Sequence, residues 1–154
     1  MEQKVDQIKE NNEFQLGSTF LGKNGLLDVT PLKTNKVTCL YFSASYCPPC
    51  QAFTPLLIDF YNEINMEDKV LEIILIPFDI TEEEFKTYYK QMPWLAIPLG
   101  DERIKKFTSY FKIKAIPKLI ILKPNGEAAA TNGRMDVIQE GEDAFNKWKS
   151  FMEQ

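Results

Sequence analysis

The chain has 154 residues, enough for one domain with its own hydrophobic core, and its 44% hydrophobic and 26% charged residues are typical of globular proteins. A net charge of −4 does not favour binding to nucleic acid or to an anionic membrane, so we expect neither as a partner. Histidine is missing from the sequence, which excludes Cys–His hydrolases, Ser–His–Asp triads and zinc sites with histidine ligands.

The N-terminal residues 1–12 are polar, and we interpret them as an extension before a single domain over residues 13–154. They contain no apolar stretch of the kind found in secretory signals. The longest apolar runs, at 73–77 and 119–122, are too short to cross a bilayer. We therefore expect a cytoplasmic protein that makes no membrane contact, and we expect it to be a monomer.

The first half of the predicted domain contains strands followed by a helix. The Asn-Gly pair at 24–25 is a strong signal for a hairpin turn. Residues 37–42 are β-branched, aromatic and uniformly apolar, which predicts a strand at the centre of a sheet. The stretch Cys-Pro-Pro-Cys at 47–50 then opens a helix that runs to about Asn65, with apolar residues at helical spacing. Pro55 lies inside this helix and should kink it.

The second half alternates between strands and helices. Thr81 with Glu84 three residues later forms a capping box that begins a helix, and a Pro-Asn-Gly turn joins two late strands. In chain order we expect a strand at 70–78, a helix after Thr81, a short helix at 103–111, strands at 118–123 and 128–131, and a helix at 137–151. Strands separated by helices pair in parallel and the late hairpin adds an antiparallel edge, so the sequence predicts an α/β fold with a mixed sheet.

Two of the three cysteines, Cys47 and Cys50, lie one helical turn apart directly after a buried strand. This context is typical of a redox-active pair, because the free N–H groups and the positive end of the helix dipole stabilise a thiolate there. We expect Cys47 to be the nucleophile and Cys50, one turn inside the helix, to be the resolving thiol. A zinc site needs four ligands, and Cys39 is the one cysteine left, so we expect no metal. Cys39 lies mid-strand, where packing in the core is the usual role of a free cysteine.

The two prolines between the cysteines limit how the thiolate can be stabilised. If Cys47 is the N-cap, its sulfur can accept hydrogen bonds from the second or third helical residue. The second is Pro49, which has no N–H, so the N–H of Cys50 is the local backbone donor that is left. We expect a modestly stabilised thiolate, which suits a protein that donates electrons rather than a strong oxidant.

Several stretches of the sequence together resemble one family. They are Phe-Ser-Ala-Ser-Tyr-Cys-Pro-Pro-Cys at 42–50, Phe-Thr-Pro-Leu-Leu at 53–57, Met-Pro-Trp-Leu-Ala-Ile-Pro at 92–98, Ile-Pro at 116–117 and Thr-Asn-Gly-Arg at 131–134. From about residue 14 to 148 the chain resembles the tryparedoxin/nucleoredoxin branch of the thioredoxin superfamily. The resemblance implies a thioredoxin fold with an N-terminal β-hairpin. It also implies dithiol exchange with disulfide-containing proteins such as peroxiredoxins.

Residue by residue, the resemblance implies that Cys47 is the nucleophile, Cys50 the resolving cysteine and Pro117 a cis-proline that faces the pair. A cis bond would turn the backbone of Ile116 outward to pair with a substrate strand.

We expect three further residues, Tyr46, Pro48 and Trp94, to contact the substrate together with Ile116 and Pro117. Tyr46 stands where most relatives have Trp, and it can still shield one side of the site. Trp94 could equally fill the core.

Two other residues are candidates for proton relay to Cys50. Tyr41 occupies the position of the buried acid of thioredoxins, and Asp79 ends the neighbouring strand. Helix entry beside Thr81 is the alternative role for Asp79. Lys118 stands where the branch usually has Thr, and it either favours the thiolate or is a solvated lysine at a strand edge.

The sequence leaves the electron donor and one functional alternative open. Trypanothione or glutathione as a low-molecular-weight thiol, or a reductase, are all compatible with the pair. We expect no nucleotide cofactor, because no Gly-rich phosphate loop precedes a helix. The leading alternative is a redox-sensitive, nucleoredoxin-like binding module without significant turnover. A third possibility is a periplasmic-type thiol reductant cut from its membrane anchor.

Overall fold

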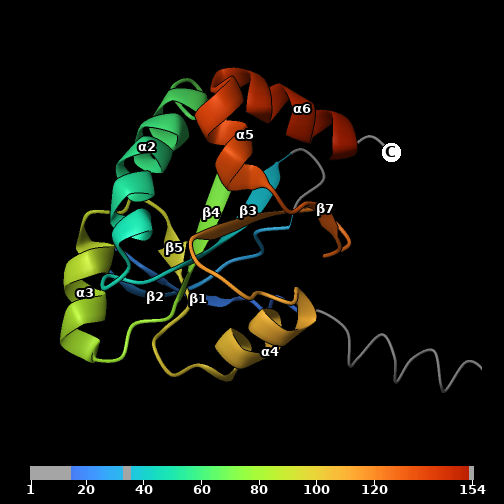
Figure 1. Cartoon of the computed structure of the whole chain (residues 1–154). Coiled ribbons are helices and arrows are strands. Elements are labelled where there is room, and N and C mark those ends of the chain that lie inside the picture. The colour runs from blue at the N-terminus through green and yellow to red at the C-terminus, as the bar shows by residue number, and fades with distance from the viewer. Residues whose placement is uncertain (1–14, 33–35, 153–154) are drawn as a thin grey trace, which may run out of the picture.

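The computed structural model describes residues 15–32 and 36–152, and its strands form one mixed sheet in the order β2-β1-β5-β4-β3-β6-β7 (Figure 1). The strands are β1 (Thr19–Gly22), β2 (Gly25–Asp28), β3 (Val37–Ser43), β4 (Leu71–Pro77), β5 (Leu95–Ala96), β6 (Lys118–Leu122) and β7 (Ala128–Ala130). The helices are α2 (Pro48–Ile64), α3 (Glu82–Lys90), α4 (Glu102–Tyr110), α5 (Gly133–Glu140) and α6 (Glu142–Met152). The predicted extension at 1–12 lies outside the described residues, so the predicted domain boundary stays a prediction.

The centre of the sheet is the parallel pair β3 and β4. Both strands are buried along their whole length, in a register that runs from Val37 opposite Leu71 to Ser43 opposite Pro77. Strands covered by helices on both faces need mostly apolar side chains on both faces, which explains why their sequences do not alternate. The predicted central strand is confirmed.

Antiparallel strands complete both sides of the sheet. The hairpin predicted from the Asn-Gly pair is β1 and β2, and β1 joins the sheet by pairing with β5. On the other side β6 pairs with β3, and β7 pairs with β6. Parallel pairing of strands separated by helices holds for β3 with β4 and for β4 with β5. In contrast, β6 enters from the end where β3 finishes, with Lys118 opposite Phe42, and therefore runs antiparallel.

Helices cover both faces of the sheet and divide the core into two clusters (Figure 1). On one face, Cys39 and Tyr41 of β3 pack with side chains from α2, α3 and α6. On the opposite face, Leu40 and Phe42 pack with Phe107 of α4 and with β1. Successive residues of a strand point to opposite faces, so β3 contributes to both clusters. Its C-terminal end leads directly into the start of α2, where the cysteine pair lies.

Two details differ from the sequence-based expectation. The single helix predicted at 137–151 is two helices, α5 and α6, because Gly141 adopts a φ of 57° between them and helical φ values are negative. The prediction also missed the two-residue strand β5, which is too short to show a period of two. Helix α2 contains Pro55, as predicted, and the kink expected there stays a prediction.

Candidate functional site

The loop between β3 and α2 places Cys47 at the N-cap of α2, with an extended backbone of φ −98° and ψ 110°. The N–H of Cys50 donates a hydrogen bond to the Cys47 sulfur over 3.3 Å. Pro48 and Pro49 fill the first two helical positions, where a backbone N–H has no partner in the helix. This is the donor arrangement that the two prolines predict.

The two sulfurs differ in exposure. Cys47 is 8% exposed, whereas Cys50 is 0% exposed. Burial, and then the hydrogen bond between the two cysteine side chains, raise the pKa of Cys50 to about 11, and a hydrogen bond with Ser43 opposes this rise. Both cysteines are free thiols in this structure. The Cys50 thiol therefore keeps its proton at neutral pH and faces the more exposed sulfur, that of Cys47.

The loop before β6 closes over the pair. The Ile116–Pro117 peptide bond is cis, as the resemblance implies. The carbonyl oxygen of Ile116 accepts a hydrogen bond from the Cys47 thiol over 3.7 Å. Pro117 is buried and Ile116 is partly exposed, and Ile116 packs with Phe78 against the cysteines. The backbone of the loop before β6 thus lies directly beside the Cys47 sulfur.

Four buried hydroxyl groups lie beneath Cys50, and the sequence analysis identified one of them, Tyr41. Ser43 and Tyr88 are joined at 2.7 Å, Tyr88 and Thr54 at 2.8 Å, and Thr54 and Tyr41 at 2.7 Å. The Thr54 hydroxyl also donates to the carbonyl oxygen of Cys50 over 2.8 Å. Polar residues within apolar stretches, Ser43 at the end of β3 and Thr54 on the apolar face of α2, are the signal that could have found them.

These hydroxyl groups stay neutral, and Ser43 is the one that acts on the inner sulfur. Burial raises the pKa of Tyr41 and of Tyr88, so neither ionises near neutral pH. The hydrogen bond between Ser43 and Cys50 lowers the pKa of the thiol, which means that it favours the thiolate. The hydroxyl of Tyr41 bonds Thr54, one step away from the sulfur. Its predicted part in proton relay stays a prediction.

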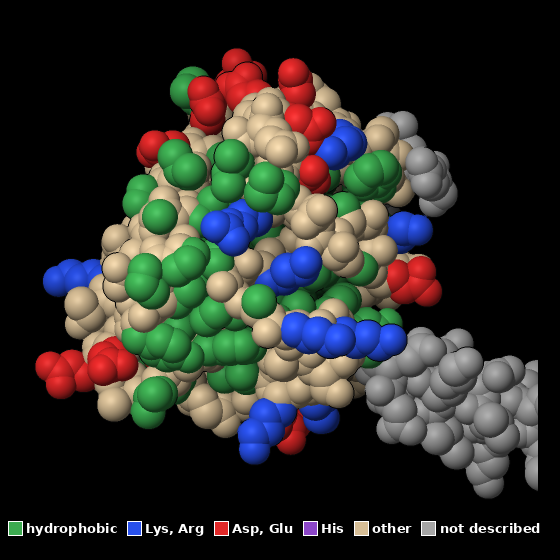
Figure 2. Space-filling view, in the orientation of Figure 1, with side chains coloured by type: hydrophobic (Ala, Val, Ile, Leu, Met, Phe, Trp, Pro, Cys, Tyr) green, Lys and Arg blue, Asp and Glu red, His purple; other side chains and the backbone are tan. Residues whose placement is uncertain are grey.

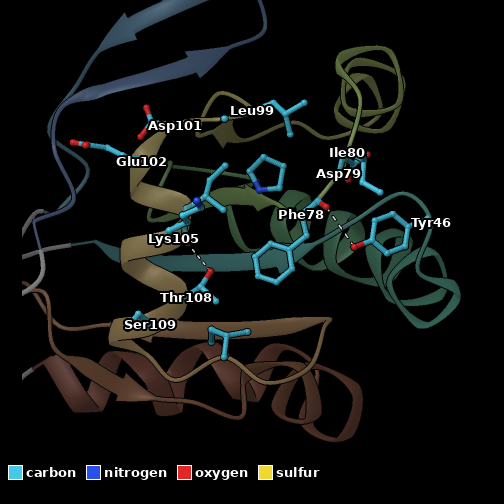
Figure 3. Close-up of a pocket in the computed structure, with 14 residues that line it drawn as sticks. Tyr46, Phe78, Asp79, Ile80, Leu99, Asp101, Glu102, Lys105, Thr108 and Ser109 are labelled. Carbon is cyan, nitrogen blue, oxygen red and sulfur yellow. Dashed lines mark hydrogen bonds between the residues drawn. The ribbon is translucent and has the colours of Figure 1, made fainter.

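Tyr46 lies exposed at the rim of a groove of about 900 Å³ between the cysteine loop and α4 (Figure 3). Its hydroxyl donates to the carbonyl oxygen of Phe78 over 3.4 Å. Ile80 is also exposed on this groove, and Pro48 is exposed at the start of α2. The Tyr46 and Pro48 side chains are both exposed beside Cys47, and their predicted contact with a substrate stays a prediction.

Asp79 holds the loop that precedes the cysteines. One carboxylate oxygen accepts a hydrogen bond from the N–H of Ser45 over 3.0 Å, and the second oxygen, which is buried, has no partner among the described residues. The side chain is 7% exposed. This contact with the loop is an alternative to the predicted proton relay, which stays a prediction.

The structure places Trp94 in the core. It is 2% exposed and packs edge-on against Tyr41 and Tyr61, with ring centroids 6.1 and 5.5 Å apart. Of the two roles that the sequence left open for Trp94, its placement favours core packing.

The remaining candidates fall outside the site. Cys39 is fully buried on β3. Within residues 15–32 and 36–152, no cluster of three or more acidic, cysteine or histidine side chains could hold a metal ion. None of the helices in these same segments is long and apolar enough to span a bilayer.

Comparison with known proteins matches residues 35–128 to a family described as thioredoxin-like. A probable nucleoredoxin 1 of Arabidopsis thaliana is 41% identical over 125 residues, which are 81% of this chain and 22% of the relative. The tryparedoxin of Trypanosoma brucei brucei is 37% identical over 134 residues, which are 85% of this chain and 91% of the relative. The chain thus spans about a quarter of the length of the nucleoredoxins it matches.

Solved structures agree with these matches. A tryparedoxin from Trypanosoma brucei superposes with a TM-score of 0.75 at 37% identity, over 88% of this chain and 94% of that one. Tryparedoxin II in complex with glutathionylspermidine superposes with a TM-score of 0.74 at 38% identity, over 84% of this chain and 90% of that one. The resemblance drawn from the motifs is confirmed.

Proposed function

The chain belongs to the thioredoxin-like family, in its tryparedoxin and nucleoredoxin branch, and on this premise we propose that it reduces protein disulfides by dithiol exchange. One observation carries the proposal: the Cys47 sulfur lies at the N-cap of α2, 3.3 Å from the N–H of Cys50, whose own thiol is fully buried. An attacking thiolate needs access and stabilisation, whereas a resolving thiol needs proximity and protection. Cys47 has the position of the attacking thiolate, and Cys50 has that of the resolving thiol.

The exchange has two steps. The Cys47 thiolate attacks one sulfur of the partner disulfide, forming a bond between Cys47 and the partner while the partner's other sulfur leaves as a thiolate and takes up a proton. Cys50 then gives up its proton and attacks Cys47. A Cys47–Cys50 disulfide forms, and the partner's second sulfur leaves and is protonated. The partner gains two electrons and two protons, and the pair is oxidised.

The surroundings of the pair support this order of events. A pKa of about 11 keeps Cys50 protonated, and therefore inert, until a mixed disulfide forms next to it. The Ser43 hydroxyl then stabilises the Cys50 thiolate as it develops. The carbonyl group of Ile116, whose oxygen is 3.7 Å from the Cys47 sulfur, is positioned to hold the partner chain during the attack.

We expect peroxiredoxin-type proteins as partners and a low-molecular-weight thiol as electron donor. A related tryparedoxin has been solved with glutathionylspermidine, which is such a thiol. The donor would restore the dithiol by the reverse chemistry, with two donor thiols oxidised for each pair reduced. A reductase as donor, a cytoplasmic location and a monomeric state remain predictions from the sequence.

Insulin reduction driven by dithiothreitol tests the proposal. Wild type should accelerate the precipitation of the insulin B chain, and Cys47→Ser should abolish the acceleration. Cys50→Ser should also lose turnover, because the mixed disulfide cannot be resolved within the protein. Full activity of Cys47→Ser would end the assignment. Cys39→Ser serves as the matched control, since it removes the thiol that lies outside the site.

A redox-sensitive binding module is the second candidate, because the segment that matches this chain makes up about a quarter of each nucleoredoxin. Such a module would hold its partner in one redox state of Cys47 and Cys50 without turnover. Equal affinity of the reduced and the oxidised protein for a captured partner would argue against it. Turnover in the insulin assay would favour the reductase.

A further inference from the structure

Basic side chains gather beside the cis-proline loop, although the chain as a whole carries a net charge of −4. A cavity of about 380 Å³ adjoins Pro117, and four of its lining residues are positively charged: Lys112, Lys114, Lys118 and Arg134. No aspartate or glutamate lines it. Within the described parts of the chain, none of the four cations takes part in an ion pair.

Three separate elements bring these cations together. Lys112 and Lys114 lie in the turn after α4, Lys118 begins β6, and Arg134 is in the first turn of α5. Helix α5 can approach β6 closely because its first residue is Gly133, where a Cβ atom would lie 2.9 Å from a backbone oxygen of β6. Three of the cations thus come from one basic stretch, residues 112–118, and tertiary packing adds Arg134.

Two features of the cavity indicate an anionic occupant. The Nε of Arg134 is buried and has no hydrogen-bond partner among the described residues. The N-cap residue of α5, Asn132, lines the cavity but makes no side-chain capping bond, so the first N–H groups of the helix lack that partner. A carboxylate would satisfy both the guanidinium and the helix end.

The cavity adjoins the loop that contacts the cysteine pair. Pro117 lines the cavity, and the residue before it, Ile116, contacts the Cys47 sulfur over 3.7 Å. On this face of the molecule, basic side chains run between α5 and α4, apolar side chains cover the area toward the start of α2, and acidic side chains lie toward the edges (Figure 2). Exposed Tyr46 and Ile80 lie on the groove that adjoins the cysteine loop.

We propose that the basic cavity binds an acidic segment of the partner polypeptide while the partner's disulfide lies over Cys47. The proposal rests on the proposed function and names the partner as a protein whose reducible disulfide is flanked by aspartate or glutamate. A polypeptide fits better than a small thiol, because the basic and apolar areas together form an extended surface with charge beside an apolar centre. Charge complementarity of this kind sets the partner and the rate of encounter.

Two synthetic peptides test the proposal. Both contain the same intrachain disulfide; one has Asp and Glu beside it and the other has Asn and Gln in the same positions. The reduced protein should react with the acidic peptide about tenfold faster at low ionic strength, a preference of the size that electrostatic steering gives. The preference should shrink as salt is added, because exposed charges are screened.

Charge reversal shows whether the cavity is responsible. In Lys112→Glu/Lys114→Glu the ratio of the two peptide rates should fall to about one or below it. The control Lys86→Glu/Lys90→Glu changes the net charge equally on α3, which contributes no residue to the cavity lining, and should keep the wild-type ratio. Taking a ratio within each variant removes any effect of the substitutions on the dithiol itself.

Three results would overturn the docking proposal: equal rates for the two peptides in wild type, an equal loss of preference in the α3 control, or a preference for the small anion dithiodipropionate over hydroxyethyl disulfide as large as that for the acidic peptide. The last would assign the cations to a small molecule. A wild type that reduces neither the peptides nor hydroxyethyl disulfide would instead overturn the proposed function, so the two failures are distinguishable.

Discussion

Removing the Ser43 hydroxyl should slow the second step of the exchange and leave the first unchanged. The Ser43 hydrogen bond favours the Cys50 thiolate, and the pKa of Cys50 is about 11 even with that bond in place. A hydrogen bond of this kind contributes about 1 kcal/mol, so Ser43→Ala should raise the pKa of Cys50 by roughly 0.7 unit. Below its pKa, the thiolate fraction of Cys50 then falls roughly fivefold, and so should the rate of resolution.

The assay is stopped-flow release of thionitrobenzoate from the protein. The first release reports the attack of Cys47 on the reagent, and the second reports the attack of Cys50 on the mixed disulfide. Rates are measured from neutral pH to above the pKa of Cys50, where the difference between Ser43→Ala and wild type should disappear.

Tyr41→Phe is the matched control, because it removes a buried hydroxyl of the same network that bonds Thr54 instead of Cys50. An equal slowing of resolution in Ser43→Ala and Tyr41→Phe, or a Ser43→Ala difference that persists above the pKa of Cys50, would refute the reasoning.

Three further predictions concern stability. Between pH 9.0, the ordinary pKa of a cysteine, and about pH 11, the folded reduced protein keeps the Cys50 proton while the unfolded chain loses it. The free energy of unfolding of the reduced protein should therefore fall by roughly 2 to 3 kcal/mol across that range, relative to the oxidised protein. Denaturant titrations of both forms check this, and parallel pH curves would contradict it. Gly133→Ala places a Cβ 2.9 Å from a β6 backbone oxygen and should cost about 1 to 3 kcal/mol, whereas exposed Ile138→Ala on the same helix should cost less than about 0.5 kcal/mol. Asp79→Ala removes the acceptor of the Ser45 N–H and should lower the thermal midpoint, with a loss of about 1 to 3 kcal/mol, while Asp79→Asn keeps an acceptor and should stay near wild type.

The parts of the site that the sequence predicted are those set by local rules. An N-cap position and two prolines determine which N–H can reach the Cys47 sulfur, and the structure has that bond at 3.3 Å. The central strand was recognisable because burial on both faces demands a continuous apolar run. These features depend on residues a few positions apart.

The parts that were missed depend on residues far apart in the chain. Ser43 and Tyr88 lie 45 residues apart, and their hydroxyl contact follows from how α3 packs against β3. Trp94 could be assigned to the core only once the sheet was in place. Near Pro117, Lys112, Lys114 and Lys118 lie within seven residues of sequence, but the sequence does not show that Arg134 of α5 packs beside them.

Mixed-disulfide trapping tests the central claim most directly, because it shows which sulfur attacks. Cys50→Ser and Cys47→Ser are each mixed with an oxidised peroxiredoxin, and the adducts are mapped by mass spectrometry. We expect a stable disulfide between Cys47 and the partner in Cys50→Ser and none in Cys47→Ser. An adduct on Cys50 of comparable yield, or no adduct in either variant, would contradict the assignment of Cys47 as the attacking sulfur and Cys50 as the resolving sulfur.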